Sequence, residues 1–483
     1  MKISALALFS LLVFSCQALA DNQTTDVSPI LTSGLSYSIG LQVADMGSAT
    51  LPTLQSYAVG SYNGEWIFVA GRTNGLHNFT NDGLLNFPPA FQNQDIWIVD
   101  PTTKQTWSRS IATSDLSSTA INALSATSPE SVQNGNTLYV AGGYLYASGT
   151  FTTYNTLTAL DLPGVVDWVK NGSSSLASQV RQTTDAAVQV TGGRMDMVNG
   201  KTLLSFGQDF EGPYTPGANG VYTQQVRSFT INDSGGNLSI SDVSASIADP
   251  NFRRRDMNIV PIVTTGSTGP ALVALSGVFT TSGGAWTVPV EISADGTPSM
   301  ADPNNPATFK QGMNNYAAPS IVLYSQTRDE NNIVVLGGIS LETNMSGTFV
   351  PDNELPFTSQ ATTIVRNSDG IYTQYYLGDV YPDVIDESTG NPLLFGAGAE
   401  FLRNPNLALV DGAINLDALT TETMLGWVFG GIAAQQANDG ATAGSNELFE
   451  VWYTPVPEPS VTALLFAAGG VAVGWRLRRK RLS

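Results

Sequence analysis

Two groups of charged residues in this sequence could do chemistry. The first is the run Arg253, Arg254 and Arg255, followed by Asp256. Successive side chains of an extended chain point in opposite directions, so the three arginines cannot all face one ligand. One or two of them at a central channel could bind a carboxylate or a sugar. The alternative interpretation is a salt-bridged start of a strand in an acidic protein.

The second group is acidic and contains Asp379, Asp383 and Asp386. Paired carboxylates can hydrolyse glycosidic bonds, and clustered oxygen ligands can hold calcium. No EF-hand spacing is present, so calcium binding has no motif behind it. Solvated surface carboxylates are the alternative. Long loops also carry aromatic residues that could stack on sugars or meet a protein partner, namely Phe79, Phe87, Phe91 and Tyr214.

Cysteine and histidine chemistry is almost absent. The only cysteine is Cys16 and the only histidine is His77. A disulfide framework, a thiol nucleophile in the exported part and a multi-histidine metal site are therefore excluded. A Ser-His-Asp triad would depend on His77 alone, which we interpret as an ordinary loop residue. We predict no cofactor.

The composition indicates the class of structure that must position these residues. Only 13% of residues are charged, and 40 acidic residues outnumber 21 basic ones. An acidic surface repels nucleic acid, so we expect no nucleic-acid partner. Short apolar runs alternate with clusters of Gly, Asn, Asp and Pro, and long helical periods are missing. The sequence therefore predicts an all-β extracellular domain.

One element recurs six times along the chain: a short apolar run that ends in a small residue and glycine. The final glycines lie 72, 64, 70, 61 and 93 residues apart. A second strand-like run follows each copy. Solidly apolar runs are typical of strands buried on both faces, and one small sheet cannot bury both. A closed ring of four-stranded blades solves that problem. The six runs are Trp66–Gly71, Leu138–Gly143, Leu203–Gly207, Leu272–Gly277, Ile333–Gly338 and Gly426–Gly431.

Asn-Gly pairs precede three of these runs. Asn63-Gly64, Asn134-Gly135 and Asn199-Gly200 each predict a type I′ turn that closes a hairpin, because Asn-Gly favours positive φ at both central positions.

The pattern resembles the kelch repeat, whose marks are a diglycine after the second strand and a later aromatic residue. The diglycines are Gly142-Gly143, Gly337-Gly338 and Gly430-Gly431, and the degraded versions end in Gly71, Gly207 and Gly277. Repeats longer than the ~50 residues usual for kelch imply long loops. The resemblance implies a β-propeller over residues 21–455, with six blades or seven. One or two sandwiches with Gly-ended strands are the alternative.

Copper radical oxidases that resemble galactose oxidase share this type of fold. They need a cysteine cross-linked to a tyrosine and histidine ligands, which this chain lacks.

The last blade needs a strand from elsewhere. After Leu448–Trp452 the chain passes almost directly to Pro455 and the C-terminal segment, so the fourth strand is missing. Leu35–Val43 could supply it and close the ring without a covalent bond.

The N-terminus has the form of an export signal. Lys2 precedes an apolar run from Ile3 to Phe14, and Ala18-Leu19-Ala20 predicts cleavage after residue 20. A second interpretation makes Cys16 a lipidated residue of a lipobox.

The C-terminus combines three parts in order: Pro457-Glu458-Pro459, an apolar run over 461–475, and a basic cluster of Arg476, Arg478, Arg479, Lys480 and Arg481. The run is short for a membrane span of ~20 residues, but snorkelling arginines make a transmembrane helix plausible. Residues 456–483 resemble the PEP-CTERM sorting signal of Gram-negative bacteria. That resemblance implies processing by an exosortase-like protease. A tail anchor that is never cut is the alternative.

These observations lead to two functional hypotheses. The first is an exported surface or matrix protein, membrane-anchored at least transiently, that binds polysaccharide or a surface protein through a propeller face without catalysis. The second is a carboxylate-based hydrolase or lyase acting on extracellular polysaccharide.

Overall fold

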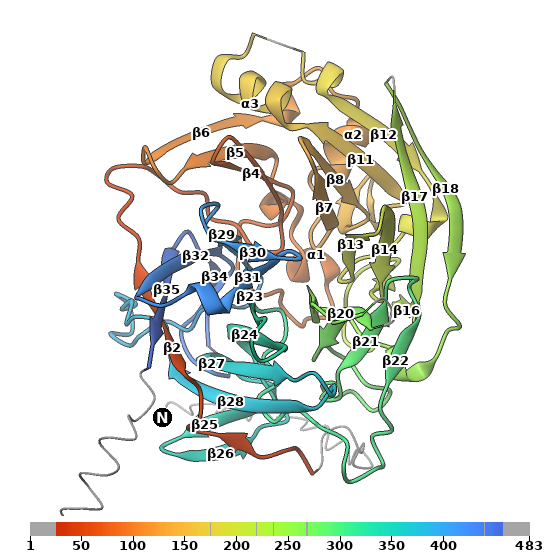
Figure 1. Cartoon of the computed structure of the whole chain (residues 1–483). Helices are drawn as coiled ribbons and strands as arrows, with labels where there is room; N and C mark the ends of the chain where they lie inside the picture. Colours follow the sequence, from red (N-terminus) through yellow and green to blue (C-terminus); the bar gives the residue numbers. More distant parts are fainter. Residues whose placement is uncertain are drawn as a thin grey trace, which may run out of the picture.

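The protein is described by a computed structural model over residues 26–456, except residues 174, 219, 235, 267, 268 and 439. It is an all-β, propeller-like ring of sheets around a central axis (Figure 1). The predicted leader over residues 1–20, with Cys16, and the predicted sorting tail over 457–483 lie outside the described residues. Within those residues, no helix is long and apolar enough to cross a membrane.

Five of the sheets are separate and have four antiparallel strands each. Sheet 1 contains β3 (Ala58–Tyr62), β4 (Glu65–Val69), β5 (Asp95–Asp100) and β6 (Gln105–Ser110). Sheet 2 contains β7 (Glu130–Asn134), β8 (Thr137–Ala141), β11 (Thr156–Asp161) and β12 (Val180–Thr184). Sheet 3 contains β13 (Arg194–Val198), β14 (Lys201–Ser205), β17 (Val226–Ser234) and β18 (Asn237–Ala245). Sheet 4 contains β19 (Asn258–Pro261), β20 (Pro270–Leu275), β21 (Val290–Ser293) and β22 (Pro298–Met300). Sheet 6 contains β29 (Ala399–Arg403), β32 (Thr423–Gly430), β35 (Leu448–Pro455) and β2 (Tyr37–Val43).

Sheet 5 has seven strands and corrects the prediction of separate four-stranded units throughout. Its centre is the expected meander of β23 (Ser320–Ser325), β24 (Glu330–Ile339), β27 (Phe357–Arg366) and β28 (Tyr372–Asp379). Two further segments pair parallel to its edges, β1 (Ile30–Leu31) on β28 and β31 (Ala413–Asn415) on β23, while β30 (Leu409–Val410) pairs with β31. The long interval before Gly431 therefore extends a sheet and forms no seventh blade.

Short hairpins and helices decorate the ring. Four two-stranded hairpins follow the second strand of sheets 2, 3, 5 and 6: β9 (Tyr144–Ala147) with β10 (Thr150–Thr153), β15 (Gln208–Asp209) with β16 (Val221–Tyr222), β25 (Glu342–Met345) with β26 (Thr348–Pro351), and β33 (Ile432–Ala434) with β34 (Thr442–Gly444). The helices are α1 (Gly83–Asn86), α2 (Ser118–Ala123) and α3 (Leu162–Asn171).

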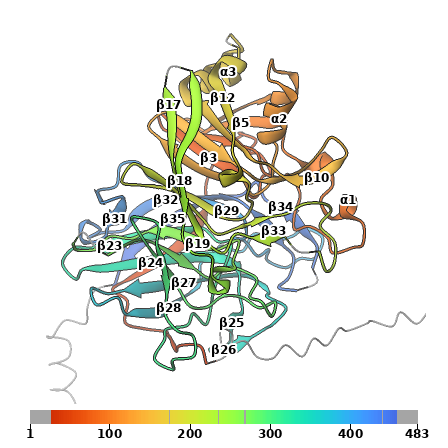
Figure 2. The same cartoon turned by 90° about the vertical axis from the view of Figure 1, so that its right-hand side faces the viewer.

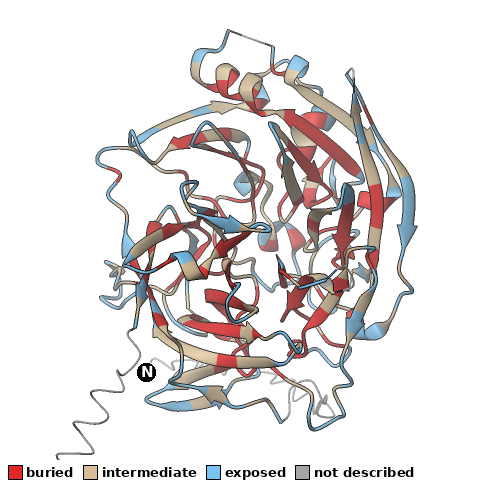
Figure 3. Ribbon diagram, in the orientation of Figure 1, coloured by how far each residue is buried: buried red, intermediate tan, exposed pale blue. Residues whose placement is uncertain are grey.

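The hydrophobic core is divided into layers that lie between neighbouring sheets. In β4, Ile67 and Val69 pack toward sheet 2, whereas Trp66 and Phe68 pack toward sheet 6. A strand alternates its side chains between two faces. Because both faces of β4 meet another sheet, the whole run is apolar, as the sequence indicated. Figure 3 shows the buried residues concentrated in these strands.

The repeat glycines all adopt positive φ, a conformation that glycine takes at little steric cost. Gly142 has φ of 63°, and a Cβ there would lie 2.1 Å from the carbonyl oxygen of Val190 in the neighbouring segment. In the degraded copies, Ala70, Phe206 and Ser276 take the first glycine's place and still have φ between 54° and 62°. The left-handed conformation is therefore retained where the glycine is lost.

Two of the three Asn-Gly turns form as predicted. Asn63-Gly64 and Asn199-Gly200 are two-residue loops with positive φ at both positions. The prediction for Asn134-Gly135 is wrong, because Asn134 pairs with Thr137 and the loop residues are Gly135 and Asn136. The glycine takes the first loop position there, with φ of 56°.

The predicted closing strand is confirmed. β2 pairs antiparallel with β35 over seven residues, from Tyr37 opposite Pro455 to Val43 opposite Phe449. Tyr37, Ile39 and Leu41 are buried, so the N-terminal segment completes sheet 6 and its core.

Candidate ligand-binding site at the channel mouth

Six residues form a hydrogen-bonded neck around the channel. Each lies just before the first strand of one sheet and has φ between 48° and 69°. The backbone N–H of each donates to the carbonyl of the preceding member at 2.7–3.3 Å, and the first donates to the last, so the circle closes. We call this set the neck: Ser56, Ser128, Gly192, Asp256, Ala317 and Gly398. Because the neck is backbone-bonded, it holds the six sheets at fixed spacing around the axis.

The neck separates two cavities. The upper cavity has a volume of about 590 Å³ and lies on the side of α1 and the four short hairpins. The lower cavity has a volume of about 220 Å³ and lies on the side of the hairpin turns between the first two strands of each sheet. Neck residues line both cavities.

The wall of the upper cavity is built from equivalent positions in the sheets. The residue before each neck residue pairs with the residue after each repeat glycine, which continues the ladder between the first two strands. Side chains at both positions line the cavity. The pairs are Gln55 with Arg72, Thr127 with Tyr144, Thr191 with Gln208, Arg255 with Val278, Tyr316 with Ile339, and Ala397 with Ile432.

Arg72 is a buried cation at this wall. Its side chain donates from Nε to Asn74 Oδ1 at 2.9 Å and from Nη2 to the carbonyl of Pro88 at 3.0 Å. The guanidinium lies 5.1 Å from the centre of the Phe87 ring. Burial lowers the pKa of Arg72 to about 10. No carboxylate of a described residue lies within ion-pair distance, so its charge is free to meet a ligand.

Arg255 is the second cation of the upper cavity. Its Nη2 donates to the hydroxyl of Tyr214 at 3.2 Å, and its Nε lies 3.3 Å from Asp256 Oδ2. The guanidinium also lies 5.3 Å from the centre of the Phe279 ring. Burial is the largest single influence and acts to lower the pKa of Arg255, but Asp256, Tyr222 and Tyr214 together outweigh it and raise the pKa. Arg255 is therefore a permanent cation whose position is held from two sides.

His77 belongs to the site, although sequence reasoning treated it as an ordinary loop residue. Its ring stacks on Phe87 at 4.9 Å and meets Phe79 and Tyr214 edge to face at 4.5 and 4.6 Å. Burial lowers the pKa of His77 to about 4, so the ring is neutral at pH 7. The loop aromatics Phe79, Phe87 and Tyr214, already noted in the sequence, were the sequence feature that could have predicted this cluster.

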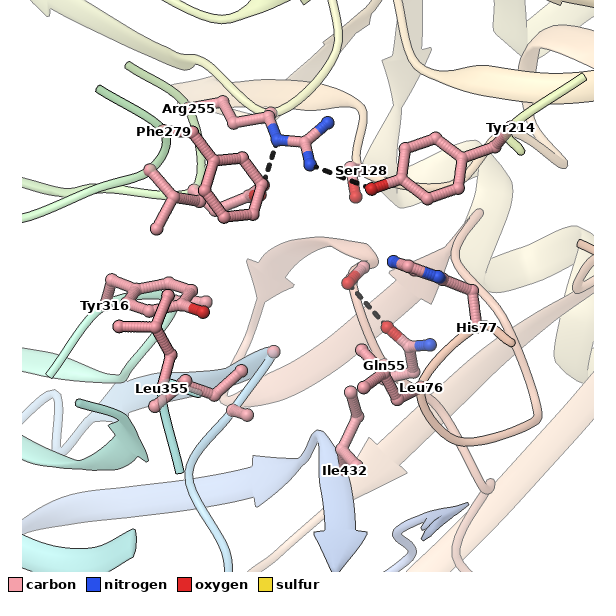
Figure 4. A pocket seen from close by; sticks show the side chains of 18 of the residues that line it. Gln55, Leu76, His77, Ser128, Tyr214, Arg255, Phe279, Tyr316, Leu355 and Ile432 are labelled. Carbon is pink, nitrogen blue, oxygen red and sulfur yellow. Dashed lines mark hydrogen bonds and ion pairs between the residues drawn. The ribbon is translucent and has the colours of Figure 1, made fainter. Parts of the chain in front are cut away.

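The opposite wall is apolar. Leu76, Ile339, Leu355 and Ile432 belong to one hydrophobic cluster that lines the upper cavity. Figure 4 shows Arg255, Phe279 and Tyr214 along one wall, with Leu355 and Ile432 across from them. The cavity is thus amphipathic, with Arg255 and Tyr214 on one wall and aliphatic side chains together with Tyr316 across from them.

Loops from different sheets hold the rim of the upper cavity in place. Asn86 Nδ2 donates to the carbonyl of Tyr214 at 2.6 Å, and the N–H of Leu76 donates to Thr442 Oγ1 at 2.9 Å. The N–H of Phe357 donates to the carbonyl of Ala437 at 2.9 Å. Contacts between sheets 1, 3, 5 and 6 therefore preform the cavity.

The three predicted arginines separate as extended geometry requires. Only Arg255 lines the upper cavity. Arg254 is fully buried between strands, where it donates to the carbonyls of Ser276 and Val288 at 3.2 and 3.3 Å. Burial lowers the pKa of Arg254 to about 9. Arg253 donates to the carbonyl of Thr280 and lies over the Tyr222 ring at 3.8 Å.

The predicted acidic cluster lines neither cavity. Asp379 ends β28 and is exposed, as is Asp383 in the loop that follows. Asp386 accepts hydrogen bonds from Ser388 and Thr389, and these bonds, led by the Ser388 hydroxyl, lower its pKa. Asp386 therefore shapes a turn. Within the described residues, no group of three or more His, Cys, Asp or Glu side chains could hold a metal ion.

The lower cavity contains carboxylates that sequence reasoning missed. Glu130 at the start of β7 and Glu400 near the start of β29 line this cavity, together with Arg194 at the start of β13. Burial raises the pKa of Glu130 to about 8, although the N–H of Gly193 donates to it at 2.8 Å. Burial also raises the pKa of Glu400, and Arg194 partly offsets that rise. The signal was a charged residue two positions after a neck residue.

No family model and no curated protein matches the sequence. A solved structure described as "Structure of YjhT" is similar, with a TM-score of 0.44 and 11% sequence identity. The alignment covers 84% of this chain and 97% of that chain.

Proposed function

We propose that this protein is an exported surface or matrix protein that binds a carboxylate-bearing polysaccharide in its upper cavity, without catalysis. One observation carries the proposal: Arg72 and Arg255, both largely buried, line the same preformed cavity beside aromatic rings. Arginine pairs with carboxylates in two-point hydrogen bonds, and aromatic faces suit the apolar faces of sugars.

The negative charge of the whole chain strengthens the argument that these arginines bind an anionic ligand. The net charge is −19, so the surface repels anionic polymers at long range. An anionic ligand would need a local cationic group, and Arg72, which has no ion-pair partner among the described residues, supplies one in the upper cavity. The same repulsion favours a ligand with spaced carboxylates over a densely charged one.

The finer architecture is also a proposal. We count the meander of sheet 5 as one of six blades in a kelch-like ring, because the neck has six members and a core layer lies beside each sheet. The leader over residues 1–20 and the PEP-CTERM-like tail with its basic cluster are the proposed means of export and anchoring. An exosortase-like protease is the proposed processing partner.

A hydrolase or lyase remains the second candidate. It is favoured by Glu130, whose raised pKa keeps a proton near neutral pH, and by Glu400 in the same cavity. A protonated acid beside a second carboxylate is the pair that glycoside hydrolysis requires.

Binding and product analysis on one set of samples separate the two candidates. The purified protein would be screened on a panel of neutral and acidic polysaccharides, with and without calcium, and each bound polymer assayed for new reducing ends. We expect binding of acidic polymers without new ends. Release of shorter sugars would establish the enzyme instead, and binding of neutral polymers only would contradict a carboxylate site.

A further inference from the structure

The chain leaves the ring on the side opposite the upper cavity. β32 runs from Thr423 up to Gly430, and Ile432 just beyond it lines the upper cavity. β35 is antiparallel to β32, with Leu448 opposite Phe429 and Tyr453 opposite Thr423. It therefore runs back toward the lower side, where Pro455 ends it and Val456 donates to the carbonyl of Ser36.

The two sides of the ring carry different elements. In the side view of Figure 2, α1 and β34 lie on one side of the sheets and β31 lies on the other. The two-residue turns at Asn63, Asn136 and Asn199 are exposed on the lower side, because each first strand runs from the neck down to its turn.

Little chain separates the exit point from the apolar tail. The apolar run begins at Val461, and the five chain steps from Val456 span at most about 18 Å. A ring tethered on so short a connection cannot turn its far side toward the membrane that holds it.

We propose that, while the tail anchors the protein, the lower side faces the membrane and the upper cavity faces outward. This orientation rests on the proposed anchoring by the C-terminal tail. It explains how an anchored copy binds a polymer before any processing of the tail, since the upper cavity is open to the outside. The lower cavity is screened from large polymers until the tail is released.

Cysteine labelling of the full chain tests this orientation cleanly. The only cysteine is Cys16, inside the proposed leader, so a single introduced thiol is the only target in the exported protein. Asn81→Cys places it on the upper loop beside α1, and Asn136→Cys places it on a lower turn; both positions are exposed. Each variant is expressed in a Gram-negative host without an exosortase, and alkaline-washed membranes are labelled with a polymer-linked maleimide. The same protein in detergent gives the reference rate.

We expect the membrane to slow labelling of Asn136→Cys several-fold and to leave Asn81→Cys unchanged. Equal slowing at both sites, or slowing at Asn81→Cys alone, would overturn the orientation while the anchoring stood. Loss of the protein from washed membranes would overturn the anchoring and the orientation with it. Polysaccharide binding by the protein released in detergent tests the proposed function separately. If Asn136→Cys does not fold, Asn199→Cys reports on the same side.

Discussion

At the scale of single residues, the central question is whether buried cations bind the ligand. Arg72 has no carboxylate partner among the described residues, and its side chain donates hydrogen bonds to two neutral oxygens, Asn74 Oδ1 and the carbonyl of Pro88. Such a charge is costly to bury and is stabilised when an anion enters. We therefore expect an anionic ligand to supply the counter-charge that Arg72 lacks among the described residues.

Replacing Arg72 should weaken binding of acidic polysaccharide. Arg72→Gln removes a hydrogen-bonding charge worth roughly 1.5–3 kcal/mol, which is about a ten- to hundredfold loss of affinity. The matched control is Arg403→Gln, an exposed position at the far end of β29 that should bind as the parent does. Titration calorimetry measures both. Equal affinities for the two variants would exclude Arg72 from the site.

Glu130 predicts a distinct pH dependence of stability. Its folded pKa of about 8 lies above the ordinary glutamate value of 4.5, so near neutral pH the folded state holds a proton that the unfolded state releases. The contribution of Glu130 is fully present below pH 4.5 and is lost as pH rises through 8. The side chain of Glu130→Gln cannot titrate, so this variant does not lose stability in the same way as pH rises. The melting temperature of the variant minus that of the parent should therefore be larger at pH 8 than at pH 5. A constant difference at both pH values would disprove the raised pKa.

At the scale of elements, the repeat glycines combine left-handed backbone with close approach of a neighbour. Gly142→Ala should lower the free energy of unfolding by roughly 2–5 kcal/mol, from the left-handed φ and the overlap with the Val190 carbonyl. Gly135→Ala has a similar φ in open space and should cost only about 1–2 kcal/mol. Denaturant titration compares them, and equal costs would show that the close approach does not matter.

The closing strand β2 predicts that the N-terminal segment stabilises the whole ring. Ile39 is buried in the core between sheets 5 and 6, so Ile39→Ala should cost about 2–4 kcal/mol. Ser38 is its exposed neighbour, and Ser38→Ala should stay within about 0.5 kcal/mol. Deletion of residues 21–45 should lower the melting temperature further. An unchanged melting temperature after that deletion would refute closure by β2.

The elements that could be predicted from the sequence are the strands that pack against a neighbouring sheet on both faces. Trp66–Val69 is apolar throughout because sheets lie on both sides, and the glycines after such runs mark crowded strand ends. Additions at sheet edges escaped prediction, because β1 and β30 are two residues long and carry no periodic pattern. The helix α3, whose start is capped by Asp161, also escaped prediction.

At the scale of the whole molecule, ring closure was predictable and the site was largely not. The neck residues have little in common but positive φ, which leaves no sequence pattern across serine, glycine, aspartate and alanine. Arg255 was found as part of a basic run, whereas Arg72 is a lone arginine after Gly71. Arg72, Tyr144 and Gln208 each directly follow a repeat glycine. This shared position is the one sequence feature that could have predicted that their side chains line the same cavity. The acidic residues near Asp383 are close together in the sequence, but they do not form a site among the described residues.

The molecule as a whole is thus a ring with an upper cavity that contains Arg72 and Arg255 and a lower cavity that contains Glu130 and Glu400, joined through the neck. We therefore assign ligand binding to the upper cavity, whereas the lower cavity lies on the side where β35 ends and the C-terminal segment begins. The central claim is that the upper cavity recognises carboxylates.

The measurement that tests this claim most directly is calorimetric titration of the protein with one acidic oligosaccharide and its carboxyl-reduced counterpart. The account predicts binding of the acidic form, loss of at least about tenfold in affinity on carboxyl reduction, and the same loss in Arg255→Gln. Equal affinity for the two oligosaccharides, or full binding by a protein lacking both Arg72 and Arg255, would contradict it.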